Sequence, residues 1–391
     1  MWNLKSKLVS AMEAEEISLP SKIIIDDTTL REGEQTPGVV FSLEDKLEIA
    51  RRLVEVGIQR LEAGFPAASK GEMNAVKSIV REGLDAEIFG FSRAVKSDID
   101  AVIECDCYGV MLSFPPSDIH LKYKLKMTRE QYLERAVECV EYAKSHGLYI
   151  TYSAEDSTRT DLNFLKKVFK TVVDSGVDCA RIVDTLGVAT PTLMKKLVSA
   201  VKETVPVEIE VHCHNDHGLG TANTLAAVEA GASVLSTSVN GLGERTGIAP
   251  TEEVIVALHN LYGVKSFRTQ KLYELCKLVE KISGVKIPPS KPVCGINVFT
   301  HVSGIHQDAV LKSPITYEPY PPELVGQRRR LLLGKLSGSH AIKAKLAEIG
   351  INAKEEEIKK LTAMVKEISE NRRSALTDEE FSELVKKVIK R

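Results

Sequence analysis

The 391-residue sequence has no excess of charge of either sign and no long apolar run. Its 52 Lys and Arg residues and 54 Asp and Glu residues are spread along the chain and give a formal net charge of -2. This balance provides neither the basic field that attracts nucleic acid nor a polybasic membrane anchor. No apolar stretch approaches the roughly 20 residues needed to cross a bilayer. We therefore expect neither a nucleic-acid partner nor a membrane span.

We also expect neither a secretion signal nor a disulfide framework. The start, Met1-Trp2-Asn3-Leu4-Lys5, is not followed by an apolar signal core. The seven cysteines are odd in number and lie mostly in helix-like or strand-like sequence, which is typical of reduced thiols. Cys105 and Cys107 could hold a soft metal, but no second cysteine pair accompanies them, and two half-buried thiols beside a turn are the favoured interpretation. The sequence predicts a cytoplasmic protein.

Short β-branched segments alternate with longer amphipathic ones through most of the chain. Eight strand patterns, each followed by a helical pattern, extend over about 240 residues, which is the length and order of a (β/α)8 barrel. An open doubly wound sheet is the alternative, but it normally carries Gly-x-Gly-x-x-Gly after its first strand, and Thr28–Gln35 has none. The predicted strands are Lys22–Asp27, Arg60–Gly64, Glu87–Ser92, Gly109–Ser113, Tyr149–Ser153, Cys179–Val183, Glu208–His212 and Val234–Ser238.

Two short motifs nearly two hundred residues apart indicate a metal site. Residues two apart in a strand point to the same face, so His212 and His214 can present two imidazoles to one ion. Glu32 follows the first strand and adds a carboxylate, while Arg31 beside it is a fixed cation suited to a carboxylate or an oxyanion. Two imidazoles, one carboxylate and open positions describe a catalytic divalent site. The alternative, a chance His-x-His on a surface strand, is disfavoured by the Arg31–Gln35 segment at another strand end.

Polar residues able to do chemistry also fall at the predicted strand ends. In a (β/α)8 barrel, active sites lie at the carboxyl ends of the strands. Because the strands were assigned from hydrophobic pattern, this agreement supports the barrel and predicts an active site on that rim. The residues at the strand ends are Arg31, Glu32, Glu62, Arg93, Ser153, Glu155, Asp184, Thr185, His212, His214 and Asn240.

Several long motifs along nearly the whole chain match those of one enzyme family. One is Leu30-Arg31-Glu32-Gly33-x-Gln35, followed after ten intervening residues by Lys46, and another is His212-x-His214-Asn215-Asp216-x-Gly218. On these residues the sequence resembles the acetyl-CoA-dependent 2-oxoacid synthases, which include homocitrate, isopropylmalate and citramalate synthases. Further matches are Ser153–Asp156, Asp184–Pro191, Asn240–Gly247, Gly304-x-His306 and Leu333–Gly338.

The resemblance implies a metal-dependent Claisen-type condensation of acetyl-CoA with a 2-oxoacid, followed by thioester hydrolysis. Glu32, His212 and His214 would hold a divalent ion (Mg, Mn or Zn), which polarises the ketone as a Lewis acid. Arg31 would stabilise the same oxygen as it becomes an alkoxide. His306 of the partner subunit would take the methyl proton of acetyl-CoA. The resemblance also assigns catalytic roles to Glu155 and Tyr317 and substrate contacts to Gln35, Arg93, Ser153, Thr185, Asn240, Gly241 and Gly243, although residues 240–247 could instead form an ordinary tight loop.

The acceptor that the resemblance favours is 2-oxoglutarate. The chain stops at Arg391, whereas leucine- and isoleucine-pathway synthases usually continue into a regulatory domain. Glu32 stands where those enzymes generally have Asp, and Phe299-Thr300-His301 and Tyr317-Glu318-Pro319 look like homocitrate synthases. Against this, homocitrate synthases of lysine biosynthesis carry an arginine where this chain has Thr151. A dicarboxylate would then need another cation, for which the candidates are Arg93, His120 and Lys122.

The same resemblance suggests a homodimer whose sites are completed across the interface. We divide the chain into a catalytic (β/α)8 TIM barrel with an N-terminal arm over residues 1–262, a linker and lid or dimerisation segment over 263–335, and a mostly helical C-terminal extension over 336–391. The alternatives are isopropylmalate or citramalate synthesis from 2-oxoisovalerate or pyruvate, and synthesis from longer 2-oxoacids or oxaloacetate. A hydroxyacyl-CoA lyase or a silent acyl-CoA-binding subunit would be the interpretations outside this class.

Overall fold

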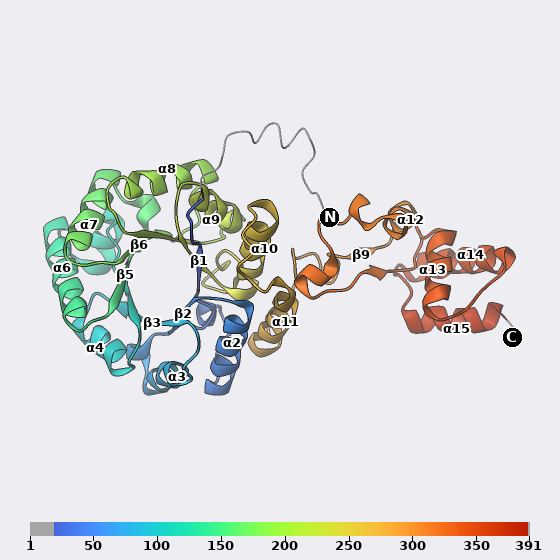
Figure 1. The fold of residues 1–391 in the computed structure, drawn as a ribbon, viewed down its shortest axis with the longest axis horizontal. Coiled ribbons are helices and arrows are strands. Elements are labelled where there is room, and N and C mark those ends of the chain that lie inside the picture. Colours follow the sequence, from blue (N-terminus) through green and yellow to red (C-terminus); the bar gives the residue numbers. More distant parts are fainter. Residues whose placement is uncertain (1–18, 390–391) are drawn as a thin grey trace. The chain divides into compact units, whose positions relative to one another are not determined.

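The computed structural model describes residues 19–389 and forms two compact units (Figure 1). The first unit runs through Lys286 and the second begins at Ile287. The N-terminal arm predicted ahead of the barrel lies outside the described residues. Within residues 19–389, no helix combines the length and the apolar character that a bilayer crossing requires.

The first unit is a closed barrel of eight parallel strands in sequence order. The barrel closes where β8 pairs with β1, with Ile24 opposite Val234 and Asp27 opposite Thr237. The predicted (β/α)8 barrel is therefore confirmed. The strands are β1 (Ile24–Asp27), β2 (Arg60–Gly64), β3 (Glu87–Arg93), β4 (Gly109–Ser113), β5 (Tyr149–Ala154), β6 (Cys179–Asp184), β7 (Glu208–Cys213) and β8 (Val234–Thr237).

Helices follow the strands and surround the barrel (Figure 1). The first begins at a capping box, in which the Ser42 hydroxyl accepts from Asp45 N–H and the Asp45 carboxylate accepts from Ser42 N–H. One helix beyond residue 262, α11 (Leu272–Ser283), packs against α2 and belongs to the first compact unit. The outer helices are α2 (Leu43–Val56), α3 (Lys70–Arg81), α4 (Lys96–Glu104), α6 (Arg129–Ser145), α7 (Leu162–Asp174), α8 (Pro191–Lys202), α9 (Gly220–Glu229) and α10 (Thr251–Leu261).

Paired charges fill part of the barrel interior. Arg181 is buried on β6, and its Nη2 lies 2.9 Å from Asp26 Oδ2, 2.5 Å from Glu62 Oε1 and within contact of Glu210. Arg60, also buried, pairs with Glu87 and packs over an aromatic ring 4.8 Å away. Burial raises the pKa of Asp26 well above its ordinary value, and the charges of Glu210 and Glu62 add to the shift. Such a buried cluster is stable only while each charged group keeps a partner of opposite charge, because an uncompensated buried charge is strongly destabilising.

All seven cysteines are buried free thiols. Burial raises the pKa of the Cys105 and Cys139 thiols to about 11. The pKa of Cys213 rises to about 12 for the same reason. These groups therefore stay protonated at neutral pH.

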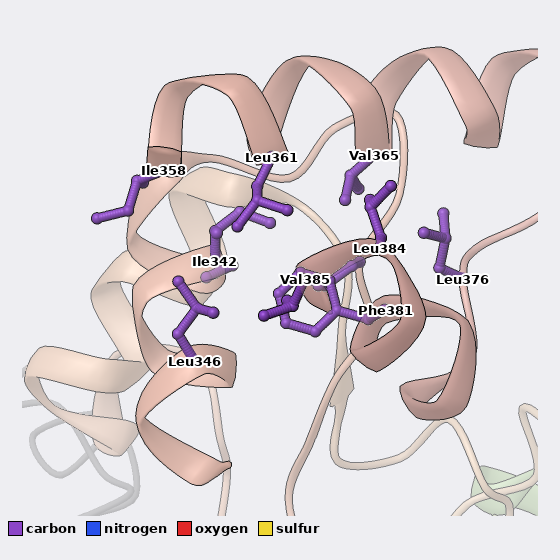
Figure 2. Packing of buried hydrophobic residues seen from close by; sticks show 11 residues of the cluster. Ile342, Leu346, Ile358, Leu361, Val365, Leu376, Phe381, Leu384 and Val385 are labelled. Atoms are coloured by element: carbon purple, nitrogen blue, oxygen red, sulfur yellow. The ribbon is translucent and has the colours of Figure 1, made fainter. Parts of the chain in front are cut away.

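The second unit is built largely from helices. Near its start, β9 (Thr300–His301) pairs in parallel with β10 (Arg330–Leu331), and α12 (Gly304–Lys312) lies between them in the chain. Helices α13 (Ser339–Glu348), α14 (Glu355–Arg372) and α15 (Asp378–Val388) then pack around a shared apolar cluster (Figure 2). This confirms the predicted helical C-terminal region. The cluster includes Ile342, Leu346, Ile358, Leu361, Val365, Leu376, Phe381, Leu384 and Val385.

Candidate active site

A cavity of about 590 Å³ opens at the carboxyl ends of the barrel strands. Its walls come from strands β3 to β7, from the segments after β1 and β8, and from α6. Asn240, Gly241 and Gly243 do not line this cavity, and His306 and Tyr317 belong to the second unit. The predicted site residues that the cavity brings together are Arg31, Glu32, Gln35, Arg93, Ser153, Glu155, Thr185, His212 and His214.

Glu32, His212 and His214 form a compact group of candidate metal ligands. One possible ligand atom from each lies within 4.8 Å of the others, and the two histidine Nε2 atoms are 3.3 Å apart. Ser236 Oγ on β8 lies 2.9 Å from His212 Nδ1 and so holds the ring with Nε2 toward His214. Ser236 carries no sequence signal of its own; the pairing of β7 with β8, which sets His212 opposite Ser236, would have been needed to find it.

The electrostatics of this group also suit a divalent ion. Burial lowers the pKa of His212 well below its ordinary value, helped by His214 and nearby arginines. Burial likewise lowers the pKa of His214, although Glu32 opposes that shift. Neutral imidazoles beside a buried carboxylate are the donor set of a catalytic divalent site. The three residues therefore fit the metal that the sequence predicts.

Arg31 is held rigidly beside the ligand group. Its Nε donates to Glu62 Oε2 at 2.7 Å, its Nη1 pairs with Glu32, and its guanidinium lies 5.0 Å from the centre of the Phe91 ring. Burial opposes the ionisation of Glu62, but Arg181 and Arg31 lower its pKa to about 2. Glu62 is thus a carboxylate that orients Arg31, and a chain of ion pairs links the barrel interior to Glu32.

The glycine-rich turn after β8 approaches Glu32 closely. The N–H of Glu244 donates to Glu32 Oε1 at 3.1 Å, and a Cβ placed on Gly243 would lie 3.2 Å from Glu32 Cγ. The side-chain amide of Asn240 donates to the Cys276 carbonyl at 3.0 Å. The turn therefore anchors itself through Asn240 and supports the candidate metal ligand through its backbone. Acetyl-CoA binding by this turn stays a prediction.

Thr185 follows β6 on the cavity wall. Its Oγ1 accepts from the N–H of Asp156 at 2.7 Å, which leaves the hydroxyl hydrogen free to donate. Arg245 donates from Nη2 to the Thr185 carbonyl at 2.6 Å and pairs with Asp216 at 2.8 Å. Sequence reasoning did not identify Arg245, because its place depends on how the β8 turn folds back over β6.

Several cations line the cavity wall. Arg93 forms two hydrogen bonds to Asp98, at 2.7 and 3.0 Å, and Lys124 lies 2.9 Å from both carboxylate oxygens of Glu155. Thr151 is fully buried on β5 and does not line the cavity. The other sequence candidates, His120 and Lys122, do not line it, whereas Arg135 of α6, which the sequence did not single out, does.

His306 and Tyr317 contact each other within the second unit. His306 lies on α12, and its ring centre is 4.1 Å from that of Tyr317. Both side chains are exposed. Beside them in sequence, the buried Glu318 lies 3.2 Å from His301 Nε2 and 2.5 Å from Arg329 Nε. The pair is thus built on a segment fixed by ion pairs.

The fold and the site together define a (β/α)8-barrel enzyme with a candidate divalent-metal centre. Residues 22–279 match the HMGL-like family, and residues 293–373 match the family described as homocitrate synthase post-HMGL domain-like. The chain therefore belongs to the HMGL-like family, in the branch that contains the homocitrate and isopropylmalate synthases. Its enzyme class is that of acyltransferases that convert the acyl group to alkyl on transfer.

Individual relatives carry different names at nearly equal similarity. The chain is 48% identical over 375 residues to homocitrate synthase AksA of Methanopyrus kandleri, covering 96% of this chain and 94% of that one. It is 52% identical over 353 residues to a probable 2-isopropylmalate synthase of the same organism, covering 90% and 71%. The crystal structure of HMG-CoA lyase from Bacillus subtilis has a TM-score of 0.63 at 19% identity, covering 69% of this chain and 96% of that one, and shows the shared fold.

Proposed function

We propose that the protein condenses acetyl-CoA with a 2-oxoacid and hydrolyses the resulting thioester, with 2-oxoglutarate as the leading acceptor and homocitrate as the product. The observation that carries the proposal is the convergence of Glu32, His212 and His214 beside Arg31 in one cavity. The match of residues 293–373 to the homocitrate synthase domain supports a synthase over a lyase.

The barrel residues bind and polarise the acceptor. A divalent ion held by Glu32, His212 and His214 supplies Lewis-acid polarisation of the ketone when bound. Arg31, fixed by Glu62, stabilises the negative charge that develops on the ketone oxygen. Thr185 donates its hydroxyl to the C1 carboxylate, since its oxygen already accepts from Asp156.

The second unit supplies the base in this proposal. His306, with Tyr317 against its ring and Glu155 in the cavity, takes a methyl proton from acetyl-CoA. The resulting enolate carbon forms a bond to the ketone carbon, and water then cleaves the thioester to release CoA. We take the protein to be cytoplasmic and homodimeric, and the exposure of His306 and Tyr317 supports an arrangement in which each pair serves the barrel of the partner.

The acceptor is the part of the proposal with a competing candidate. The identity with a probable 2-isopropylmalate synthase favours 2-oxoisovalerate as that candidate. Arginines and lysines on the cavity wall favour an acceptor with a second carboxylate. The ratio of the kcat/KM values for 2-oxoglutarate and 2-oxoisovalerate decides between these two acceptors.

A panel of acceptors tests the proposal directly. The purified protein is incubated with Mg, Mn or Zn, acetyl-CoA, and 2-oxoglutarate, 2-oxoisovalerate, pyruvate or oxaloacetate. Initial rates of free-thiol release are recorded, products are identified by mass, and the Glu32→Ala variant serves as the blank. We expect acceptor-dependent thiol release with the highest kcat/KM for 2-oxoglutarate. Cleavage of a hydroxyacyl-CoA without any condensation would overturn the proposal in favour of a lyase.

A further inference from the structure

Arg135 differs from the other cations of the cavity in its surroundings. Among residues 19–389, it is the cavity-lining arginine or lysine that makes no ion pair with a carboxylate; the nearby Glu138, on the same helix, pairs with Lys96. An unpaired guanidinium on a cavity wall is available to an anionic ligand, since it would lose no internal ion pair on binding. The other cavity cations and their partners are Arg31 with Glu32 and Glu62, Arg93 with Asp98, Lys124 with Glu155, Arg181 with Asp26, and Arg245 with Asp216.

The barrel topology sets Arg135 across the mouth from the candidate metal ligands. Glu32 follows β1, and His212 lies in β7. In the closed strand order, β8 lies between β7 and β1, and β4 lies opposite β8. Arg135 belongs to α6, the helix between β4 and β5. Figure 1 shows α6 on the side of the barrel away from β1. A 2-oxoacid with its head at the metal site would point its far end toward Arg135.

The wall on the β3 and β4 side of the cavity suits the methylene chain of such an acceptor. Phe91 belongs to β3, Phe114 and Pro115 follow β4, and Leu125 precedes α6. These side chains are apolar and therefore favour CH2 groups over charge. An acceptor with its oxoacid head at the metal site would have these apolar side chains available for its methylenes and Arg135, on the same cavity wall, available for its terminal anion.

The other cations considered for the far carboxylate are less available. Thr151, where the resemblance leads us to expect an arginine, is fully buried, and its hydroxyl oxygen has no hydrogen-bond partner. Arg93 is already neutralised by Asp98, and Lys124 by Glu155. Arg135 can therefore replace the missing arginine from a different element of the barrel.

We propose that Arg135 binds the distal carboxylate of the acceptor and selects 2-oxo dicarboxylic acids over 2-oxo monocarboxylic acids. The inference rests on the proposed condensation and assigns to it a specificity-determining residue. The guanidinium forms charge-assisted hydrogen bonds to the terminal carboxylate, while C1 and the ketone stay at the metal site.

A matched pair of acceptors isolates this contact. 2-Oxoglutarate and 2-oxopentanoate have the same five-carbon chain and differ only in the terminal carboxylate. For Arg135→Leu we expect kcat/KM for 2-oxoglutarate to fall by about tenfold to a hundredfold, the effect of losing one charged hydrogen bond. The value for 2-oxopentanoate and the KM for acetyl-CoA should stay unchanged. Arg135→Lys, which keeps the charge, should recover part of the loss.

Glu134→Leu is the control, because Glu134 is exposed on the same helix and does not line the cavity. It should behave as wild type, and Arg135→Gln repeats the measurement if the leucine variant does not fold. Equal losses for both acceptors would overturn the inference. A raised KM for acetyl-CoA with unchanged discrimination would also overturn it and would assign Arg135 to the phosphates of CoA. Wild-type activity confined to monocarboxylates would refute the role of Arg135 while leaving the condensation intact, whereas absence of any condensation would refute both.

Discussion

Replacing Arg31 by lysine tests whether the planar guanidinium, and not merely a positive charge, serves the chemistry. Arg31 uses Nε for Glu62, at 2.7 Å, and Nη1 for Glu32, while its face rests on Phe91. An ammonium group has one nitrogen at the end of a flexible stem and cannot occupy both positions. In Arg31→Lys, the lysine would pair with one of the two carboxylates and leave the ketone oxygen without an aligned donor.

The size of the effect follows from the loss of one donor to a developing oxyanion. Such a loss costs about 2.7 to 4 kcal/mol of transition-state stabilisation, so turnover should fall by about a hundredfold to a thousandfold. The fold should persist, because Glu62 keeps its ion pair with Arg181. Metal content should also persist, because Glu32, His212 and His214 are unchanged.

Initial rates of CoA thiol release, metal analysis and thermal unfolding on the same preparation separate these effects. The expected result is a large loss of turnover with wild-type metal content and a cooperative unfolding transition. Turnover within about threefold of wild type would refute the assignment of Arg31 as an oxyanion donor and leave it a structural residue.

Three further predictions concern the ligands, the base and a buried acid. Glu32→Ala and His214→Ala should lose both metal and turnover while retaining the fold, and wild-type metal stoichiometry in both variants would contradict the ligand assignment. His306→Ala should be inactive alone yet recover about a quarter of wild-type activity when mixed with Glu32→Ala, because half of randomly paired dimers hold one intact site; no recovery despite demonstrated subunit exchange would exclude a shared site. Burial raises the pKa of Asp27 to about 6 from an ordinary 3.8, so the folded state binds this proton more tightly and stability declines as pH rises from about 4 to 6. Asp27→Asn should remove that decline and stabilise the protein at pH 7 by up to about 3 kcal/mol, measured by urea unfolding at about pH 4 and about pH 7, and an unchanged pH slope would show that Asp27 is not responsible.

The barrel could be predicted because its signal is local. Arg60–Gly64 and Gly109–Ser113 were predicted with the bounds the structure gives them, since each is a short segment between helical patterns. Glu32 and His214 could be tied to the rim because their positions relative to strand ends fix where their side chains lie. Periodicity and strand-end chemistry together thus specify the fold and the candidate ligands.

What the sequence did not indicate depends on register and tertiary packing. Ser236 supports His212 only because β7 and β8 pair in one register. Arg181 forms ion pairs with carboxylates on strands distant in sequence. From the sequence alone, charged residues of this kind would be predicted to be exposed to solvent. Arg135 lies within an ordinary amphipathic helix, so its place on the cavity wall appears only once the helix is docked. Such residues need the assembled barrel to be recognised.

Because the cysteine thiols are buried, a coloured disulfide reagent can measure both CoA release and the opening of the barrel in this protein. Only the thiolate attacks such a reagent, so the buried and protonated thiols of Cys105, Cys139 and Cys213 are silent in the native state. Colour formed in the native protein therefore counts released CoA without a contribution from these three thiols. In a denaturant series without substrate, the same colour appears only as the barrel opens, and its rate follows the population of opened molecules.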